Sequence, residues 1–559
     1  MIYYSDKVKA EITDIFWERV WLKFTVKVTG DSIADKSFYI LNDRDRCVCP
    51  LLCEEKFPGY YELSVNITNI GSRRCIPEGR FRVAIGKKKN EFNGSYLVLE
   101  KEIVARLKEK AGHFLFGNGT NSYNVDFVAA VADVLEFNVR IVKTDNGVST
   151  PKTELKKVYR KNMRSFLRKL YRTERKKHFA EDKKPVILLF SEQNDGISTN
   201  LLSLKLRMLE RVIDRDFEIT ESYRITVTSR HLGFTSWVNV VTKLARADYI
   251  FMDDHAPILD WLELDKKVVV TQLWHAGVGF KASGYSRWGH FASPAPFSCH
   301  RQYTYGIAGS KKVRPVFSEI WGIDACRVLP TGLPRIDDYL NEDHRKMTID
   351  KLRDRFKIIR DKKVILFAPT YRGKNRFGAS YPYEKIDFEG LKEACGDKYV
   401  VLFKMHPWVL EPVPIPDSCK DTFLDVSSYS AINDLFYITD LLVTDYSSNI
   451  YEYSLMGKPM LFYAFDEQDY ENLRGFHVNY EEAAPGKVVR SSKAFIKAIK
   501  EEDFEVEKVK EYVDRNFDNI DTHCSDRIID WVLLDKMPED IRDEIMECDM
   551  ASSGYTKRL

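Results

Sequence analysis

The sequence predicts an α/β protein in which two doubly wound domains with parallel sheets follow a smaller, antiparallel β-sandwich-like domain. Three observations lead to this prediction. Apolar and polar residues alternate with period two up to about residue 140, and a stretch dense in Lys and Arg follows. From residue 185 onward, short apolar strands alternate with helical segments in two series that divide near residue 340. Such alternation is typical of parallel sheets that carry helices on both faces.

The bulk composition limits the class of protein. A chain of 559 residues with 44% hydrophobic residues is long enough for several domains. The formal net charge of +3 gives no reason to expect nucleic acid as a partner. The 10 cysteines lack the paired spacing of a metal site, and neither a signal region nor an apolar run long enough to span a membrane occurs. We therefore expect a cytoplasmic protein without a bound metal.

Residues 1–140 carry the strand pattern. In "VWLKFTVKV", residues 20–28, every second residue is apolar, and "YELSVNI" and "RFRVAIG" repeat the alternation. Turn signals such as "FPGY" and "IPEG" separate these runs. Half-buried strands at this spacing predict a small antiparallel sandwich. No residue in it suggests catalysis, so we expect a docking or acceptor-handling module.

The segment 141–184 contains a basic amphipathic helix. Its residues 152–184 are dense in Lys and Arg and include Arg164, Arg168 and Arg172. Five apolar residues at i, i+4, i+7, i+8 and i+11 share one helical face: Tyr159, Met163, Phe166, Leu167 and Leu170. This pattern is typical of a helix that lies on an anionic lipid surface. A solvated linker helix between domains explains the residues equally well.

The remaining chain predicts two α/β domains and a tail. Residues 185–340 contain the apolar strands "PVILLF", "ADYIFMDD", "KKVVVTQLW" and "YTYGIAGS". Residues 341–540 contain "KKVILFAPTYRG", "KYVVLFKMHPWV", "TDLLVTDYSS" and "KPMLFYAF", and residues 541–559 form the tail. Ligands of open α/β sheets bind at the carboxyl ends of the strands. We therefore expect a site between the two domains, at these strand ends.

The passage "DLLVTDYSSNIYEYSLMGKP" is the strongest single motif. A strand runs into Thr444 and Asp445, and Ser447 and Ser448 then open a helix. The first turn of a helix offers unpaired N–H groups and a partial positive charge, which suits a phosphate. Glu452, about one turn into the helix, is placed to accept hydrogen bonds from ribose hydroxyls. The competing interpretation makes Ser447 an ordinary N-cap.

Two more strands of the second α/β domain end on polar residues. "VVLFKMHPWV" delivers Lys404 and His406, and "ILFAPTYRG" delivers Thr370 and Arg372. A histidine can donate to or protonate a phosphate oxygen, and arginine suits bidentate phosphate contact. Each of these residues alone is more often structural. Three strand ends that all deliver such groups together indicate a phosphate-binding site.

The stretch "KKVVVTQLWHAGVGFK" is the matching edge of the first α/β domain. Its strand ends at His275, a candidate general base. Gly277 and Gly279 would let the backbone approach a substrate, and Lys281 and Arg287 would add cations on the acceptor side. A buried core histidine is the competing interpretation of His275.

Several other chemistries lack their motifs. The chain has no GxGxxG after its first apolar strand, no GxSxG elbow and no Walker GxxxxGK[ST]. "MDDH", which ends at His255, carries metal-ligand types but lacks a spaced partner. We expect it to end a strand and cap a helix.

Taken together, the motifs resemble the CDP-glycerol glycerophosphotransferase family, the teichoic-acid polymerases and primases of bacterial cell-wall and capsule synthesis. The resemblance spans residues 185–535 and rests on "WHAGVGFKASGYSR", "GSKKVRPVFSEIWGI", "VLPTGLPRID", "ILFAPTYRG", "FKMHP" and "TDYSSNIYEYSLMGKPMLFYAFDEQDY". The β-rich front and the basic segment also look like those of poly(ribitol-phosphate) polymerases. Glycerol enzymes of the family commonly have "WHGTPLK", whereas "WHAGVGFK" is closer to the ribitol type.

The resemblance implies a GT-B-type pair of Rossmann-like domains. It implies transfer of polyol phosphate from CDP-ribitol or CDP-glycerol to the terminal hydroxyl of a lipid-linked, undecaprenyl-type acceptor, with release of CMP. The family's catalytic histidines match His275 and His406, and its serine-rich helix start matches Ser447 and Ser448. We expect His275 to deprotonate the acceptor, while the other three and Arg372 stabilise the diphosphate. No cofactor or divalent metal is required by this arrangement.

The resemblance also bears on location and partners. A lipid-linked acceptor favours peripheral attachment of the basic segment to the inner face of the bacterial plasma membrane, and a homo-oligomer is possible. Three alternatives stay open at this point. They are a GT-B glycosyltransferase that uses a nucleotide sugar, an inactive paralogue that acts as a scaffold, and a membrane-binding adaptor.

Overall fold

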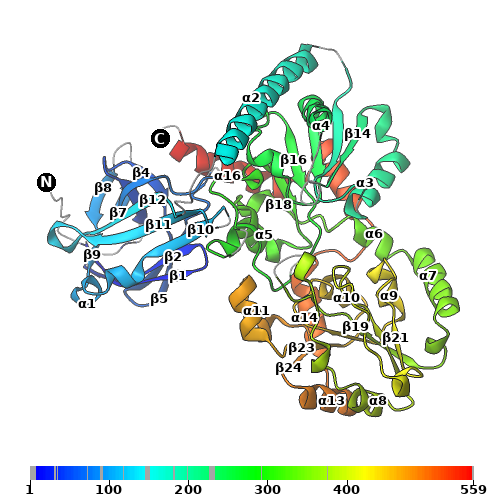
Figure 1. The fold of residues 1–559 in the computed structure, drawn as a ribbon. Coiled ribbons are helices and arrows are strands. Elements are labelled where there is room, and N and C mark those ends of the chain that lie inside the picture. The colour runs from blue at the N-terminus through cyan, green and yellow to red at the C-terminus, as the bar shows by residue number, and fades with distance from the viewer. Residues whose placement is uncertain are drawn as a thin grey trace.

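The computed structural model has a β-sandwich at its N-terminal end and two α/β domains beside it (Figure 1). It describes residues 8–556 except 31–32, 34–35, 72, 89–91, 118, 145–150, 181–182, 198, 226–232, 278, 291–292 and 374–375. The last three residues of the predicted tail therefore lie outside the described chain. The predicted fold class, a pair of Rossmann-like domains behind an N-terminal β-sandwich, is confirmed.

The N-terminal domain packs two mainly antiparallel sheets face to face. One has five strands in the order β5-β6-β2-β1-β9, and the other has seven, β10-β11-β12-β7-β3-β4 with β8 beside β7. The alternation produces the core, because Leu22, Phe24 and Val26 are fully buried. A short helix, α1 (Lys101–Val104), follows β9. The strands are β1 (Val8–Glu18), β2 (Trp21–Gly30), β3 (Ser37–Asn42), β4 (Cys47–Pro50), β5 (Leu52–Phe57), β6 (Tyr60–Asn66), β7 (Gly79–Lys88), β8 (Phe92–Tyr96), β9 (Val98–Leu99), β10 (Gly112–Phe116), β11 (Asn121–Ala129) and β12 (Leu135–Lys143).

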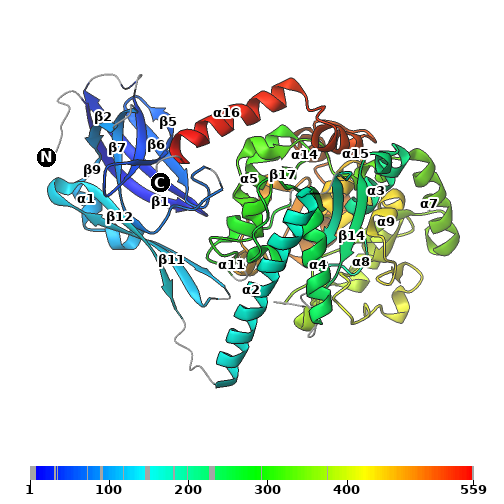
Figure 2. The same cartoon turned by 90° about the horizontal axis from the view of Figure 1, so that it is seen from above.

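The basic segment forms one long helix, α2 (Pro151–Ala180), which packs along α4 (Phe234–Arg246). Leu167 and Tyr171 are buried in the core that this contact covers. The end of α2 nearest residue 151 projects past the body of the protein (Figure 2). Among the described residues, no helix combines the length and apolar character needed to cross a bilayer.

The first α/β domain has a six-stranded sheet in the order β14-β13-β15-β16-β17-β18, and every neighbouring pair is parallel. Leu188, Leu189 and Phe190 in its central strand are fully buried, as expected for a strand covered on both faces. Its strands are β13 (Val186–Ser191), β14 (Glu218–Tyr223), β15 (Tyr249–Met252), β16 (Val269–Gln272), β17 (Tyr305–Ile307) and β18 (Val328–Leu329). Besides α4, its helices are α3 (Thr199–Glu210), α5 (Arg314–Trp321) and α6 (Arg335–Tyr339).

The second α/β domain repeats this architecture with the parallel order β21-β20-β19-β22-β23-β24. Its strands are β19 (Lys363–Phe367), β20 (Tyr399–Phe403), β21 (Phe423–Asp425), β22 (Leu441–Thr444), β23 (Met460–Tyr463) and β24 (Lys487–Val489). Its helices are α7 (Glu342–Arg355), α8 (Phe388–Cys395), α9 (Ile432–Ile438), α10 (Ile450–Ser454), α11 (Glu467–Arg474), α12 (Tyr480–Ala483), α13 (Ser492–Glu501) and α14 (Glu507–Asn516).

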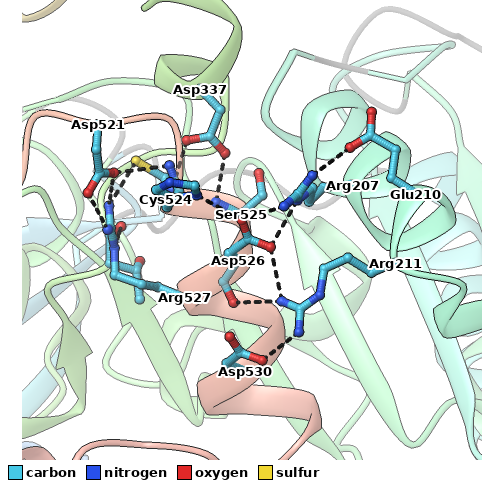
Figure 3. Close-up of polar contacts among 12 residues, drawn as sticks. Arg207, Glu210, Arg211, Asp337, Asp521, Cys524, Ser525, Asp526, Arg527 and Asp530 are labelled. Atoms are coloured by element: carbon cyan, nitrogen blue, oxygen red, sulfur yellow. Dashed lines mark hydrogen bonds and ion pairs between the residues drawn. The ribbon is translucent and has the colours of Figure 1, made fainter.

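The chain then crosses back to the first α/β domain. The domain boundaries predicted from the sequence did not include this return. Helix α15 (Cys524–Ile528) lies against α3, where Arg207 contacts both carboxylate oxygens of Asp526 at 2.9 Å (Figure 3). Arg211 binds Asp526 and Asp530 from the same side at 3.0 and 2.7 Å (Figure 3). The last helix, α16 (Glu539–Thr556), continues past the first α/β domain toward the β-sandwich (Figure 2). These contacts tie the two α/β domains together on the side away from the β-sandwich.

Candidate active site

A cavity of about 150 Å³ lies between the two α/β domains, where predicted residues of both come together. Its lining includes His275, Gly277, Gly279, Lys281 and Ser283 from the first domain and Tyr446, Ser448 and His477 from the second. The segment after His275 crosses to the second domain and pairs with it. The N–H of Ala282 donates to the carbonyl of Gly475 at 2.9 Å, and His477 donates its backbone N–H to Phe280 at 3.0 Å.

Gly277 is required by packing within the protein. A Cβ atom at this position would lie 2.0 Å from the ring of Tyr451, so only glycine fits here. The corresponding Cβ at Gly279 would lie 3.6 Å from Ser448, an ordinary contact. The close approach that the sequence suggested is therefore an approach to a tyrosine of α10, and the predicted substrate contact of the two glycines stays a prediction.

His275 is held at the cavity by a strained turn. The preceding residue, Trp274, has a left-handed backbone with φ 54°, which typically costs ~1–3 kcal/mol. The turn is fixed on both sides, because Gln272 accepts from the Trp274 N–H at 2.8 Å and Asn200 donates to its carbonyl at 2.7 Å. The side chain of His275 is 52% exposed, so the competing interpretation as a buried core histidine is wrong.

Asp254 orients the His275 ring and raises its pKa. Its carboxylate lies 3.2 Å from Nδ1, which leaves Nε2 as the nitrogen available to accept a proton. Desolvation alone would lower the pKa of His275, but the attraction of Asp254 outweighs it and raises that pKa above its ordinary value. A histidine ring with a carboxylate beside one nitrogen, and its other nitrogen available to accept a proton, has the geometry of a general base.

Glu452 lies against a cation from the first domain. Arg335 donates its Nε to Glu452 at 2.7 Å and its Nη2 to the same oxygen, and its Nη1 donates to the carbonyl of His275 at 2.7 Å. Both paired side chains are largely buried. Arg335 therefore joins α10 of the second domain to the turn that carries the candidate base. The ribose contact of Glu452 stays a prediction.

Three of the predicted phosphate ligands, Thr370, Arg372 and Asp445, form a hydrogen-bonded network among themselves, and a fourth, Thr444, bonds to a backbone carbonyl beside it. Asp445 accepts from the backbone N–H of Thr370 at 2.8 Å and from its hydroxyl at 2.5 Å, and Thr444 donates to Ala368 at 2.8 Å. Arg372 donates to Asp445 at 2.9 Å and makes two bonds to Asp466 at 2.5 and 2.8 Å. These two carboxylates already pair with the guanidinium, so the geometry gives little support to the prediction that Arg372 is one of the groups that stabilise the diphosphate.

His406 follows the end of β20, and its neutral ring is in a tautomer that can donate a hydrogen bond from Nε2. The backbone N–H of Trp408 donates to its Nδ1 at 3.2 Å, so a neutral ring carries its proton on Nε2. Desolvation, together with the charges of Lys281 and Lys404, lowers the pKa of His406 to about 4. The free enzyme therefore presents a neutral hydrogen-bond donor at pH 7, with the ring packed 4.7 Å from that of Tyr371.

The serine-rich turn precedes a helix that is shorter than expected. Helix α10 begins at Ile450, and Asn449 rather than a serine is its N-cap residue. The Ser447 hydroxyl accepts from the N–H of Asn449 at 3.2 Å, while Ser448 lines the cavity. A helix of five residues contributes little dipole, so any phosphate here would depend on the local N–H and hydroxyl donors.

Two further cations stand at the ends of elements of the second α/β domain, Lys404 after β20 and Arg474 at the end of α11, and Arg474 was not among the predicted residues. Lys404 is buried, with its Nζ 3.2 Å from the carbonyl of Ser427, and burial lowers its pKa. Arg474, at the end of α11, donates to the Tyr371 hydroxyl at 3.0 Å and to the Gly373 carbonyl at 3.1 Å. A basic residue in the last helical turn before a glycine is also an ordinary helix end, so the sequence offered no signal for it.

The comparisons with known proteins agree on one family. Residues 170–534 match the family model of CDP-glycerol:poly(glycerophosphate) glycerophosphotransferase. The chain is 38% identical over 409 residues to the teichoic acid ribitol-phosphate polymerase TarL of Staphylococcus aureus, which covers 71% of this chain and 72% of that protein. This chain belongs to the CDP-glycerol:poly(glycerophosphate) glycerophosphotransferase family. Family membership confirms the resemblance drawn from the motifs.

Two further relatives support the assignment. The teichoic acid poly(ribitol-phosphate) polymerase of Bacillus spizizenii is 30% identical over 520 residues, which cover 88% of this chain and 81% of that protein. The solved structure of the wall teichoic acid polymerase TagF aligns with a TM-score of 0.51 at 23% identity and covers 71% of this chain and 100% of that chain. At this identity, the TagF likeness supports the fold alone.

The predicted enzyme class is confirmed by the family and by these relatives. The protein is a CDP-polyol phosphotransferase of teichoic acid biosynthesis, the class of its ribitol-phosphate and glycerol-phosphate relatives. Of the alternatives, the nucleotide-sugar glycosyltransferase, the scaffold and the adaptor find no support in these comparisons.

Outside the cavity, His255 of the "MDDH" stretch has partners that the sequence did not reveal. Ligand-type atoms of His255, Asp260 and Cys299 lie within 4.8 Å of one another. His255 Nε2 lies 3.2 Å from an oxygen of Asp260, and the same oxygen accepts from the N–H of Cys299 at 2.9 Å. The set forms a hydrogen-bonded group behind Asp254, and the expectation that no metal is required stays a prediction.

Proposed function

We propose that this enzyme transfers ribitol phosphate from CDP-ribitol to the terminal hydroxyl of a lipid-linked, undecaprenyl-type teichoic acid or capsule polymer. The observation that carries the choice of ribitol is the 38% identity to a ribitol-phosphate polymerase over 71% of this chain. By comparison, the poly(glycerol phosphate) polymerase of Staphylococcus epidermidis is 32% identical over 39% of the chain. The "WHAGVGFK" stretch, which departs from the glycerol-type motif, points the same way.

In the proposed mechanism, the acceptor hydroxyl attacks the β-phosphorus of the donor in line with the departing CMP. His275 Nε2 takes the proton of that hydroxyl as the new O–P bond forms. The bond between the β-phosphorus and the bridging oxygen breaks, and CMP leaves with the electron pair. The Nε2–H of His406, the donors around Ser447 and Ser448, and Lys281 stabilise the charge that develops.

Replacement of His275 tests the assignment of the base. His275→Ala should lower the rate of CMP release at saturating CDP-ribitol, by about 100- to 10,000-fold, the range typical of a lost general base. Its matched control is His344→Ala, which changes a surface histidine on α7. Unchanged CMP release from His275→Ala would remove this residue from the base role.

We further propose that α2 attaches the enzyme to an anionic membrane surface. Leu155, Val158, Tyr159 and Phe166 follow helical spacing along one side of α2 and are 71%, 53%, 64% and 49% exposed. The same helix carries exposed basic residues, including Arg160, Lys161 and Arg172. An exposed apolar stripe next to a basic face is typical of an interfacial helix.

Some of the residues first assigned to the membrane-facing surface of α2 contact the body of the protein instead. Leu170 is half-buried against the first α/β domain, so it fixes the helix to the body. Arg168 donates to the carbonyl of Trp261 at 2.8 Å, and Arg164 lies over the Trp261 ring at 5.3 Å. Charge reversal at these two arginines would disturb the packing of α2. Tyr159, Phe166 and Arg172 remain exposed.

Flotation with vesicles that contain anionic lipid tests the attachment without disturbing that packing. Leu155→Asp combined with Tyr159→Asp, two exposed positions, should abolish flotation and leave turnover on a water-soluble acceptor analogue unchanged. The matched control is Val212→Asp, which changes an exposed apolar residue on another face. Flotation that persists in the double variant would contradict attachment through α2.

The polyol is tested by product mass. Purified enzyme is incubated separately with CDP-ribitol and CDP-glycerol in the presence of a lipid-linked acceptor. We expect mass increments of ribitol phosphate units with the first donor and little extension with the second. Extension with CDP-glycerol alone would overturn the choice of ribitol and leave the enzyme class intact.

A further inference from the structure

An imidazole, a carboxylate and a thiol converge in the first α/β domain, outside the active-site cavity. Ligand-type atoms of His255, Asp260 and Cys299 all lie within 4.8 Å of one another. His255 Nε2 lies 3.2 Å from Asp260 Oδ1, and this oxygen also accepts from the N–H of Cys299 at 2.9 Å. Cys299 is fully buried, whereas the side chains of His255 and Asp260 are 35% and 37% exposed. The three groups therefore border one small space that solvent can reach from one side.

The three residues belong to short, irregular segments that pack against one another. His255 follows β15, Asp260 ends the helical turn Pro257–Asp260, and Cys299 begins the helical turn Cys299–Gln302. The two turns are in contact. Segments of this kind have few backbone hydrogen bonds to hold them together, and a metal ion that cross-links them adds its binding free energy to the stability of the fold.

The ligand types and their spacing suit zinc. A thiolate and an imidazole favour Zn²⁺ over Mg²⁺ or Ca²⁺, which prefer oxygen ligands alone. Zinc bonds of about 2.0–2.3 Å in a tetrahedron place neighbouring ligand atoms roughly 3.3–3.7 Å apart. The 3.2 Å between His255 and Asp260 is close to this spacing, and the Cys299 sulfur needs to approach by on the order of 1 Å. Water can supply the fourth ligand from the exposed side.

Tyr303 provides a hydrogen-bonding partner for the sulfur. Its hydroxyl lies 3.3 Å from Cys299 Sγ and 3.1 Å from His300 Nδ1, and it accepts from Gln272 Nε2 at 2.9 Å. Because Gln272 donates to the hydroxyl oxygen, the hydroxyl proton is available to Cys299 or His300. Partners of this kind orient metal ligands and tune their affinity for the ion.

The same group is tied to the residues that hold the candidate base. Gln272 Nε2 also donates to the carbonyl of Asp254 at 3.2 Å, and its side-chain oxygen accepts from the N–H of Trp274 at 2.8 Å. The N–H of His255 donates to the Asp254 carboxylate at 2.6 Å. Asp254 in turn lies beside the ring of His275. An ion that fixes His255 would therefore also fix the carboxylate that orients the base.

We propose that His255, Asp260 and Cys299 bind one Zn²⁺ ion, which stabilises the loop that carries Asp254. On binding, the thiol of Cys299 releases its proton to solvent, and His255 coordinates as a neutral imidazole. The negative charges of the thiolate and the carboxylate then offset the two positive charges of the ion. The role is structural, because none of the three residues lines the cavity that contains His275. It does not depend on which polyol phosphate the enzyme transfers.

Metal titration of the full chain, purified without a histidine tag, tests this site. Enzyme dialysed against a chelator is titrated with Zn²⁺ alone, and bound metal is measured by mass spectrometry. We expect one Zn²⁺ per chain with a Kd below about 1 µM, as for structural zinc sites. Co²⁺ in its place should give the near-ultraviolet charge-transfer absorption of a thiolate–cobalt bond. Chelation should lower the thermal midpoint, and added Zn²⁺ should restore it.

Three variants identify the ligands. Cys299→Ser should remove the cobalt–thiolate absorption and raise the Kd for Zn²⁺ by more than about 100-fold. Tyr303→Phe should keep that absorption and raise the Kd by about 10- to 100-fold, the range for loss of a partner of a metal ligand. Asp260→Asn keeps an oxygen for the Cys299 N–H but should still weaken zinc binding, so it serves if Cys299→Ser fails to fold. The matched control, Cys395→Ser, changes a buried thiol of α8 and should alter neither readout.

Two results would overturn the zinc site. One is failure of the unaltered enzyme to bind Zn²⁺ with a 1:1 stoichiometry in this concentration range. The other is unchanged zinc affinity in both Cys299→Ser and Asp260→Asn. Because binding is measured without CDP-ribitol or acceptor, neither result bears on the proposed phosphotransfer.

Discussion

The buried pair between Arg335 and Glu452 offers a prediction whose magnitude follows from the structure. Glu452 is almost fully buried and receives two hydrogen bonds from Arg335. In Arg335→Met this carboxylate is left without its partner, and removal of one member of such a pair typically costs ~3–5 kcal/mol. With an unfolding entropy of about 2.1 cal/mol/K per residue over roughly 350 residues of α/β structure, the thermal midpoint should fall by about 4–7 °C.

The double variant Arg335→Met/Glu452→Met separates stability from function. Because no buried charge remains, it should recover most of the lost thermal stability. CMP release should stay low in both variants, since neither has the Arg335 contact to the carbonyl of His275. Lys510→Met, in an exposed i,i+4 pair with Asp514, is the control and should shift the midpoint by less than about 1 °C. A midpoint of Arg335→Met within 1 °C of the unaltered protein would refute the reasoning.

Three further outcomes are expected. Asp254→Asn should move the acid limb of the kcat/KM profile to lower pH, because the carboxylate that raises the pKa of His275 is gone; a limb that does not move would contradict this link. His406→Ala should lower kcat by about 100- to 1000-fold, while His406→Gln, which keeps an N–H donor, should lose less in the same CMP-release assay; equal losses would argue against hydrogen-bond donation. Gly277→Ala should cost far more activity and thermal stability than Gly279→Ala, because only the first places Cβ 2.0 Å from a tyrosine ring; equal effects would refute the packing argument.

Most of the fold could be predicted from the pattern of apolar and polar residues along the strands. Period-two alternation in residues 20–28 identified a half-buried strand, and the apolar runs before His275 and His406 identified strands covered on both faces. Because ligand sites of parallel sheets lie at the carboxyl ends of strands, the run before His275 also placed that histidine at the cavity, and a catalytic place for His406 stays a prediction. The return of α15 and α16 to the first α/β domain could not be predicted from the sequence. It depends on pairs such as Arg207 with Asp526, which are 319 residues apart.

The site could be predicted only in part, because a polar residue at a strand end has two possible partners. It can face a ligand site, as Ser448 faces the cavity. It can instead donate a hydrogen bond to a neighbouring residue, as Thr370 and Arg372 do to Asp445. Residue type and spacing are the same in both cases. Likewise, the spacing on α2 could not separate Leu170, which packs on the body, from Phe166, which is exposed. Only the three-dimensional partner decides, and that partner is distant in sequence.

The fate of the β-phosphate tests the central claim most directly. CDP-ribitol labelled in its β-phosphate is incubated with enzyme and lipid-linked acceptor, and the label is followed in polymer and nucleotide. Attack at the β-phosphorus predicts that the label enters the polymer in equal amount to the unlabelled CMP released. Label that remains in the released nucleotide, as CDP, would mean that the bond from ribitol to the phosphate had been broken. That result would contradict phosphotransfer by this enzyme.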